Sequence, residues 1–172
     1  RNNPEEIMTT TKTVRFFVYS AGVVLLITGL AKWISSAGGA RILETPDPLL
    51  TVPFRQVFWV VGGLELVVAM ICLFTKRVWL QNGLVAWLGT NFVVYRLGLL
   101  WIGYHRPCSC MGNLTDALGM SPKTADLILK IVLGYLVVGS YAVLYSLWRS
   151  ERGKAVAAKA GEGAAGSVPE PV

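Results

Sequence analysis

Long apolar runs alternate with short polar segments along the chain, and this pattern predicts the fold. Four such runs are present, at about residues 14–35, 54–75, 79–103 and 122–148. Each is long enough to cross the roughly 30 Å hydrocarbon layer of a membrane as a helix, which takes about 20 residues. We therefore expect an all-α protein with one domain, a bundle of four transmembrane helices over residues 14–148.

The segments outside these runs are polar or rich in glycine and proline. Residues 1–13 predict a loose polar N-terminus, and residues 37–53 predict a loop whose three prolines discourage a long helix. Residues 149–172 are rich in alanine, glycine, lysine and glutamate, and this composition predicts a disordered tail because it cannot bury a core. Ser121 and Pro122 predict the N-cap and first residue of the last helix.

The first run indicates a membrane span rather than a cleaved signal peptide, because it is too long and lacks a suitable cleavage site. Its small side chains predict close approach of a neighbouring helix; they are Ser20, Ala21, Gly22, Gly29 and Ala31. Lys32 and Trp33 stand at its far end, where residues that anchor a helix at the membrane interface are expected.

The distribution of lysine and arginine predicts the orientation. With both termini on one side, that side carries more basic residues (Arg1, Lys12, Arg15, Lys76, Arg77, Arg149, Arg152, Lys154 and Lys159) than the other (Lys32, Arg41, Arg55, Arg106 and Lys123). The positive-inside rule therefore predicts cytoplasmic termini. In a Gram-negative cell the protein would be a multi-pass inner-membrane protein, with the segment after the third run facing the periplasm.

Composition excludes two other classes. The 172 residues are 53% hydrophobic and 15% charged, with a formal net charge of +6. The basic residues gather at the ends of the apolar runs and form no stripe with interleaved aromatic residues, so we expect no nucleic-acid partner. Three cysteines are too few for a disulfide scaffold.

Two of those cysteines stand one residue apart, beside the single histidine, between the third and fourth runs. A disulfide between Cys108 and Cys110 would close a very small ring, so it would be strained and easily reduced. That property suits a reaction partner better than a structural crosslink. His105 or Arg106 would stabilise the reactive thiolate.

Two other interpretations of this segment stay open. The thiols could be inert loop residues, or a soft metal such as Cu(I), or zinc, could be bound by His105, Cys108, Cys110 and Met111. The spacing is not that of a zinc finger. Cys72 lies near the opposite end of the second run and predicts a small buried apolar side chain.

Charged residues inside the runs form a second group of candidates. Glu65 and Arg96 lie at similar depths, and each alone would cost at least about 2.5 kcal/mol at the bilayer centre, so we expect them to pair. They would face each other or share a polar network with Asn91, Tyr95 and Tyr104. Such a pair would set helix register, or serve a proton path or a quinone head-group site. Lys130 follows Asp126 by four residues, which favours a helical ion pair.

Several of these features together resemble the DoxX-like membrane proteins. The first run reads Arg15…Gly22…Gly29-Leu30-Ala31-Lys32, and the second reads Gly62-Gly63-Leu64-Glu65-Leu66. The segment Cys108-Ser109-Cys110-Met111-Gly112 is similar to the Cys-x-Cys-x-Gly loop of the MauE branch, the methylamine utilisation proteins. The matched positions are Lys32, Glu65, Cys108, Cys110 and Gly112.

This resemblance implies a redox-associated role. MauE-type proteins are linked to maturation of a disulfide-rich periplasmic dehydrogenase subunit, and DoxX relatives include the membrane subunit of a thiosulfate:quinone oxidoreductase. We therefore expect Cys108 and Cys110 to exchange electrons with an extracytoplasmic thioredoxin-like or disulfide-rich client, with quinone as a candidate cofactor. The alternatives are a non-enzymatic assembly or scaffold factor, a copper delivery protein, or the membrane subunit of a quinone-linked oxidoreductase. Whether the chain is itself an enzyme, a thiol–disulfide oxidoreductase, stays open at this point.

Overall fold

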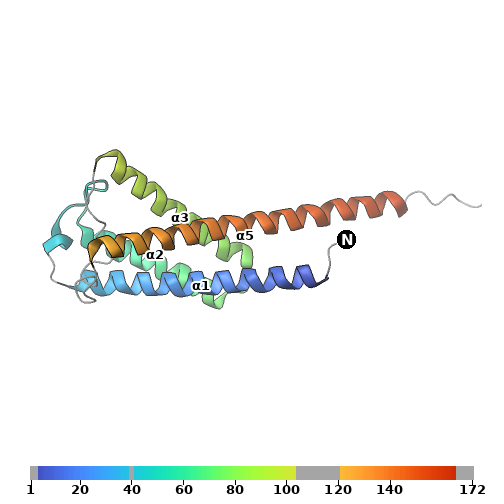
Figure 1. Ribbon diagram of the computed structural model, residues 1–172, viewed down its shortest axis with the longest axis horizontal. Coiled ribbons are helices and arrows are strands. Elements are labelled where there is room, and N and C mark those ends of the chain that lie inside the picture. The colour runs from blue at the N-terminus through green and yellow to red at the C-terminus, as the bar shows by residue number, and fades with distance from the viewer. Residues whose placement is uncertain (1–3, 39–40, 104–120, 166–172) are drawn as a thin grey trace, which may run out of the picture.

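The computed structural model describes residues 4–38, 41–103 and 121–165, and helices dominate this part of the chain (Figure 1). The helices are α1 (Pro4–Ala37), the short 3-10 helix η1 (Arg41–Glu44), α2 (Phe54–Phe74), α3 (Val78–Trp101) and α5 (Pro122–Ala165). Four of them are long and apolar enough to cross a membrane, over Lys12–Ala37, Phe54–Phe74, Val78–Trp101 and Lys123–Gly153. The prediction of an all-α bundle with four membrane spans is confirmed.

Both outer helices are longer than expected. α1 begins at Pro4, so most of the segment predicted to be loose is helical. α5 continues to Ala165, past the predicted end at Trp148, and extends well beyond the other helices (Figure 1). The physical reason is the high helix propensity of alanine, lysine and glutamate, which dominate this extension. A composition that cannot bury a core still forms a helix when it continues one that is already nucleated.

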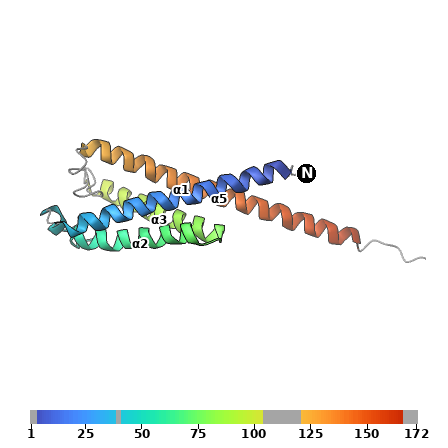
Figure 2. The same cartoon turned by 90° about the horizontal axis from the view of Figure 1, so that it is seen from below.

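The helices form two closely packed pairs. α1 packs mainly against α2, and α3 packs mainly against α5. The N-terminal end of α1 and the C-terminal end of α5 lie at one end of the bundle (Figure 1). The C-terminal ends of α1 and α3 lie at the other end, with the beginnings of α2 and α5 (Figures 1 and 2). Which end faces the cytoplasm stays a prediction.

Glycines allow α1 and α2 to approach closely, as the small residues of the first run predict. A Cβ atom added to Gly29 would lie 3.1 Å from the carbonyl oxygen of Gly62. One added to Gly62 would lie 2.7 Å from Cδ1 of Trp33. The two backbones therefore meet at this crossing, with no room for a larger residue at Gly62 unless Trp33 moves.

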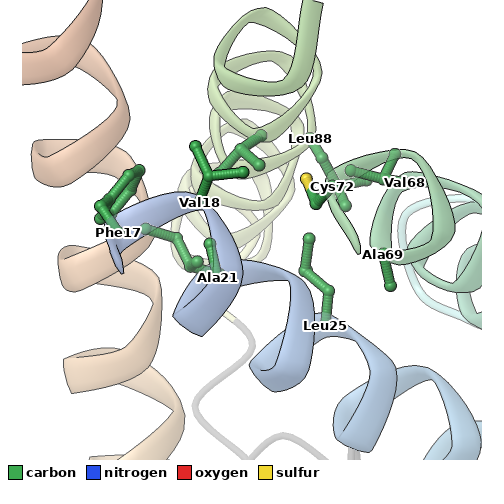
Figure 3. Close-up of a cluster of buried hydrophobic side chains, with 10 residues drawn as sticks. Phe17, Val18, Ala21, Leu25, Val68, Ala69, Cys72 and Leu88 are labelled. Carbon is green, nitrogen blue, oxygen red and sulfur yellow. The ribbon is translucent and has the colours of Figure 1, made fainter. Parts of the chain in front are cut away.

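The apolar core lies where the four spans meet, and Figure 3 shows part of it. α1 contributes Phe17, Val18, Ala21 and Leu25, α2 contributes Val68, Ala69 and Cys72, α3 contributes Val85 and Leu88, and α5 contributes Leu136. Cys72 is 1% exposed and its thiol is free. The prediction that Cys72 is a small buried apolar side chain is confirmed.

The end of α2 is fixed by a side chain from the next helix. Gln81 of α3 is buried, and its amide nitrogen donates to the carbonyl oxygen of Cys72 at 3.0 Å and to that of Thr75. These carbonyls belong to the last turn of α2 and to its C-cap, and terminal carbonyls have no partner within their own helix. Gln81 therefore supplies hydrogen bonds to carbonyl groups that would otherwise be buried without a partner in the tight turn between α2 and α3.

Candidate functional site

An ion pair between α1 and α2 is almost completely enclosed. The Nζ atom of Lys32 donates to both carboxylate oxygens of Glu65, each at 2.8 Å. Lys32 is 7% exposed and Glu65 is 2% exposed. Gly29 precedes Lys32 by three residues, and Gly62 precedes Glu65 by three, so each glycine shares a helix face with a charged residue. The same close crossing that the glycines permit thus brings the two charges together.

This pair corrects two predictions. Glu65 pairs with Lys32 and not with Arg96, and Lys32 is a buried partner rather than an anchor at the membrane interface. The reason is rotational: two residues at equal depth meet only if their helices present those faces to each other. Trp33 does lie at the surface, where its indole nitrogen donates to the carbonyl oxygen of Trp59 at 3.2 Å.

A second group of charges joins α3 to α5. Arg96 Nη1 lies 2.8 Å from Oδ1 of Asp126, and Lys130 Nζ lies 2.7 Å from Oδ2 of the same carboxylate. The predicted ion pair between Asp126 and Lys130 is confirmed. The side chains of Arg96 and Asp126 are 24% and 17% exposed, whereas that of Lys130 is 59% exposed. This group is therefore more open to its surroundings than the pair of Lys32 and Glu65.

A cavity of about 80 Å³ lies between the four spans and brings the two groups together. Its polar wall contains Thr28, Lys32, Glu65, Tyr95 and Arg96, and its apolar wall contains Leu25, Phe92, Leu129, Val132, Leu133 and Leu136. Three of the five residues predicted to form a polar network, Glu65, Tyr95 and Arg96, therefore share one cavity. Asn91 does not line it, and its amide donates to Trp87 on the same helix at 2.8 Å. Tyr104 lies outside the described residues.

The connection between α1 and α2 is attached to the wall of this cavity. Asp47 is 1% exposed, and its Oδ1 accepts hydrogen bonds from the backbone of Leu49 at 2.8 Å and Leu50 at 3.0 Å. Its Oδ2 accepts a hydrogen bond from the hydroxyl of Tyr95. We call residues 45–53 the strap, because this contact holds the connection against α3. Sequence reasoning missed Asp47.

A glycine on α3 allows the strap to lie close. A Cβ atom added to Gly98 would lie 3.0 Å from Cδ2 of Leu49. Tyr95 and Gly98 are three residues apart and share a helix face.

The sequence signal for Asp47 was its position between two prolines, a pattern typical of a tight turn in which the carboxylate accepts hydrogen bonds from its own backbone.

The cysteine segment lies outside the described residues. This holds for His105, Arg106, Cys108, Cys110, Met111 and Gly112. α3 ends at Trp101, five residues after Arg96, and α5 begins at Pro122, four residues before Asp126. The segment is therefore attached to the bundle at the end that carries Arg96 and Asp126. Ser121 caps α5 as predicted, since its hydroxyl accepts from the backbone of Thr124 at 3.2 Å.

The predicted metal ligands, His105, Cys108, Cys110 and Met111, lie outside the described residues. Within residues 4–38, 41–103 and 121–165, no three histidine, cysteine, aspartate or glutamate residues gather in a group that could hold a metal ion. The metal alternative stays a prediction about residues that lie elsewhere.

The four spans and the charged cavity between them define a multi-pass membrane protein. The chain belongs to the family of the methylamine utilisation protein MauE, whose family model matches residues 10–149. The matched residues include the first three spans, the cysteine segment and the fourth span up to residue 149. No curated protein and no solved structure matches the chain. The MauE part of the resemblance is thereby confirmed, and the wider likeness to DoxX proteins stays a prediction.

Proposed function

We propose that this MauE family member acts in the maturation of an extracytoplasmic client protein by thiol–disulfide exchange at Cys108 and Cys110. The observation that carries the proposal is the pair of cysteines one residue apart, in a segment attached where α3 and α5 present a charged cavity. The name of the family links related proteins to methylamine utilisation. The client would be disulfide-rich or thioredoxin-like.

The exchange is balanced as follows. When a client is oxidised, one of its thiolates attacks the Cys108–Cys110 disulfide and forms a mixed disulfide. A second client thiolate then displaces the loop cysteine, so that the client gains one S–S bond and the loop regains two thiols. Two electrons and two protons pass from client to loop. Client reduction is the reverse. His105 or Arg106 would stabilise the departing thiolate.

The proposed location is the inner membrane, with both termini in the cytoplasm and the cysteine segment in the periplasm. The support is the excess of lysine and arginine on the side of the termini. The arrangement of the helices is compatible with it, because the ends of α1 and α5 that lead to the termini share one end of the bundle (Figure 1). An oxidising compartment is where an exchangeable disulfide persists.

Alkylation of cysteines in intact cells tests the sidedness and the redox state together. A membrane-impermeant maleimide should label Cys108 and Cys110 only after a reductant has been added. Cys72, buried between helices, is the internal control and should stay unlabelled until the protein is denatured. Labelling of the loop cysteines only after the membrane is opened would reverse the proposed orientation.

Replacing both loop cysteines separates redox chemistry from scaffolding. A Cys108→Ser, Cys110→Ser double variant should lose client oxidation or reduction, measured as the client's free-thiol content. Cys72→Ala is the matched control and should retain it. Full activity of the double variant would sink the exchange proposal and favour an assembly factor. A stoichiometric metal that disappears in the double variant would favour metal delivery instead.

A further inference from the structure

The proposed exchange requires an acceptor that removes electrons from the loop cysteines. If the loop oxidises a client, it is left with two thiols and must lose two electrons and two protons before the next cycle. We infer that the cavity between the four spans binds the carbonyl-bearing head group of a membrane-dissolved two-electron acceptor of the quinone class, with Arg96 donating to its oxygens. This inference rests on the proposed function and assigns a binding site to it.

The first argument is the balance of donors and acceptors in the cavity wall. Both oxygens of Glu65 accept from Lys32. Within the described residues, the ion-pair partner of Arg96 is Asp126, which is approached by Nη1. A guanidinium carries five N–H donors in a planar fork, so one carboxylate leaves several of them unused. The cavity therefore contains unused N–H donors, and these favour a ligand with oxygen atoms that accept hydrogen bonds.

The second argument is the character of the other wall. Leu25 of α1 and four apolar side chains of α5, together with Phe92 of α3, form a surface that offers no hydrogen bonds. A neutral ring with carbonyl oxygens can pack against the apolar wall and accept hydrogen bonds from the polar wall. A phosphate would place a full charge against leucine side chains, which is unfavourable without several further donors. The volume of about 80 Å³ is well above the roughly 15 Å³ that one water molecule needs.

The third argument is access from the membrane. α5 is the least buried of the four spans, and it has few contacts with α1. Figure 2 shows α1 and α5 crossing near the middle of the bundle and separating towards the end where α5 begins. The cavity is lined by residues of both helices on this side of the crossing. A head group can thus enter from the lipid while its apolar tail stays outside.

The electron balance closes with this ligand. The thiols of Cys108 and Cys110 form one S–S bond and release two electrons and two protons. The quinone takes up both electrons and both protons and becomes a quinol. The N–H donors of Arg96 would stabilise negative charge on a carbonyl oxygen as the electrons arrive.

Equilibrium binding of a short-chain quinone to the full-length protein in neutral-lipid nanodiscs tests the site. Arg96→Gln should weaken binding at least about tenfold, because it removes the charged hydrogen-bond donors from the cavity wall. Lys130→Gln is the matched control, since it removes the exposed cation of the same cluster and should change binding less than about twofold. Thermal unfolding of each variant shows whether it is folded, and Arg96→Lys provides a second variant that keeps the charge.

The outcomes separate the site from the chemistry. The Cys108→Ser, Cys110→Ser variant should bind the quinone normally yet fail to reduce it. If it binds and the client is still oxidised, the exchange proposal fails while the site stands. If folded Arg96→Gln and Arg96→Lys both bind like the natural protein, the site assignment fails. Displacement of the quinone by an anionic phospholipid at low mole fraction would also overturn it, because the cavity would then be a lipid site.

Discussion

The two charge clusters inside the bundle differ in how completely the helices enclose them. Lys32 donates to both carboxylate oxygens of Glu65, at a crossing where two glycines bring α1 and α2 together. Arg96 and Asp126 also form an ion pair at 2.8 Å, but between helices that leave both side chains partly accessible. We propose two roles for the same chemistry: the closed pair fixes helix register, and the open cluster keeps hydrogen-bond donors for the proposed ligand.

The contrast follows from packing. A buried ion pair offsets its own desolvation only when its geometry is tight and its remaining hydrogen bonds are satisfied. The glycine crossing supplies that geometry for Lys32 and Glu65. Among the described glycines, none makes a comparable contact between α3 and α5 near Arg96; further along these helices, a Cβ atom on Gly89 would meet Val137 at 2.8 Å. Substitutions in the enclosed pair should therefore affect stability much more than substitutions in the open cluster.

The largest effect is expected at the closed pair. Glu65→Ala leaves the ammonium of Lys32 buried without its partner and should lower the free energy of unfolding by about 3–5 kcal/mol. Unfolding by denaturant in mixed micelles, followed by circular dichroism, measures this. The double variant Lys32→Met, Glu65→Leu removes both charges and should recover most of the loss. A cost below about 1 kcal/mol for Glu65→Ala would show that the pair is not the closed element described here.

The strap should show the next largest effect. Tyr95→Phe removes one hydrogen bond to the buried carboxylate of Asp47 and should lower the free energy of unfolding by about 1.5–3 kcal/mol. The measurement is the same unfolding experiment, with hydrogen exchange of the strap amides as a local readout. Tyr145→Phe is the matched control, because Tyr145 is 61% exposed on α5. Equal effects of the two variants would contradict a specific role for Tyr95.

The helix crossing should be sensitive to a single methyl group. Gly62→Ala places a Cβ atom against Trp33 and should lower the free energy of unfolding by about 1–3 kcal/mol through overpacking. Gly83→Ala adds the same atom where nothing lies within 4 Å, and it should be neutral or slightly stabilising. If both changes are neutral, the close approach of α1 and α2 does not hold the ion pair in place.

The smallest effect is expected at the exposed edge of the open cluster. Lys130→Gln removes a helical ion pair worth about 0.2–0.5 kcal/mol, so the unfolding midpoint should barely move. Comparison with Lys32→Gln sharpens the contrast, since the same substitution at the buried lysine should cost several-fold more. Similar costs at the two lysines would remove the distinction between closed and open clusters.

The sequence predicted the spans well, but it missed how far α1 and α5 extend towards the chain ends. Hydropathy predicted a start at Phe54, where α2 does begin, and a third span that begins one residue after the observed Val78. It gave no information on the extension of α5 to Ala165, because helix formation there depends on propensity and not on burial. Segments that face water have no apolar pattern from which to read a boundary.

The candidate site shows a different limit. Depth along the span correctly marked Glu65 and Arg96 as residues that need partners, but depth does not say which helix face meets which. The spacing Gly29–Lys32 and Gly62–Glu65 could have indicated the true pair, because each glycine and each charge share a face. Asp47 was missed because a single loop aspartate in a turn is ordinarily exposed. The roles of Cys108 and Cys110 stay predictions.

The attachment of the strap to α3 has a consequence for biosynthesis. Lys32, Glu65 and Tyr95 belong to the first three spans and Asp47 belongs to the strap, so none of these contacts needs a residue of α5. Arg96 is the exception, because its carboxylate lies on α5. A chain in which three spans have inserted would therefore have these contacts formed, whereas the guanidinium of Arg96 would still lack its counter-ion. Arrival of the last span would both neutralise that residue and complete the wall beside it.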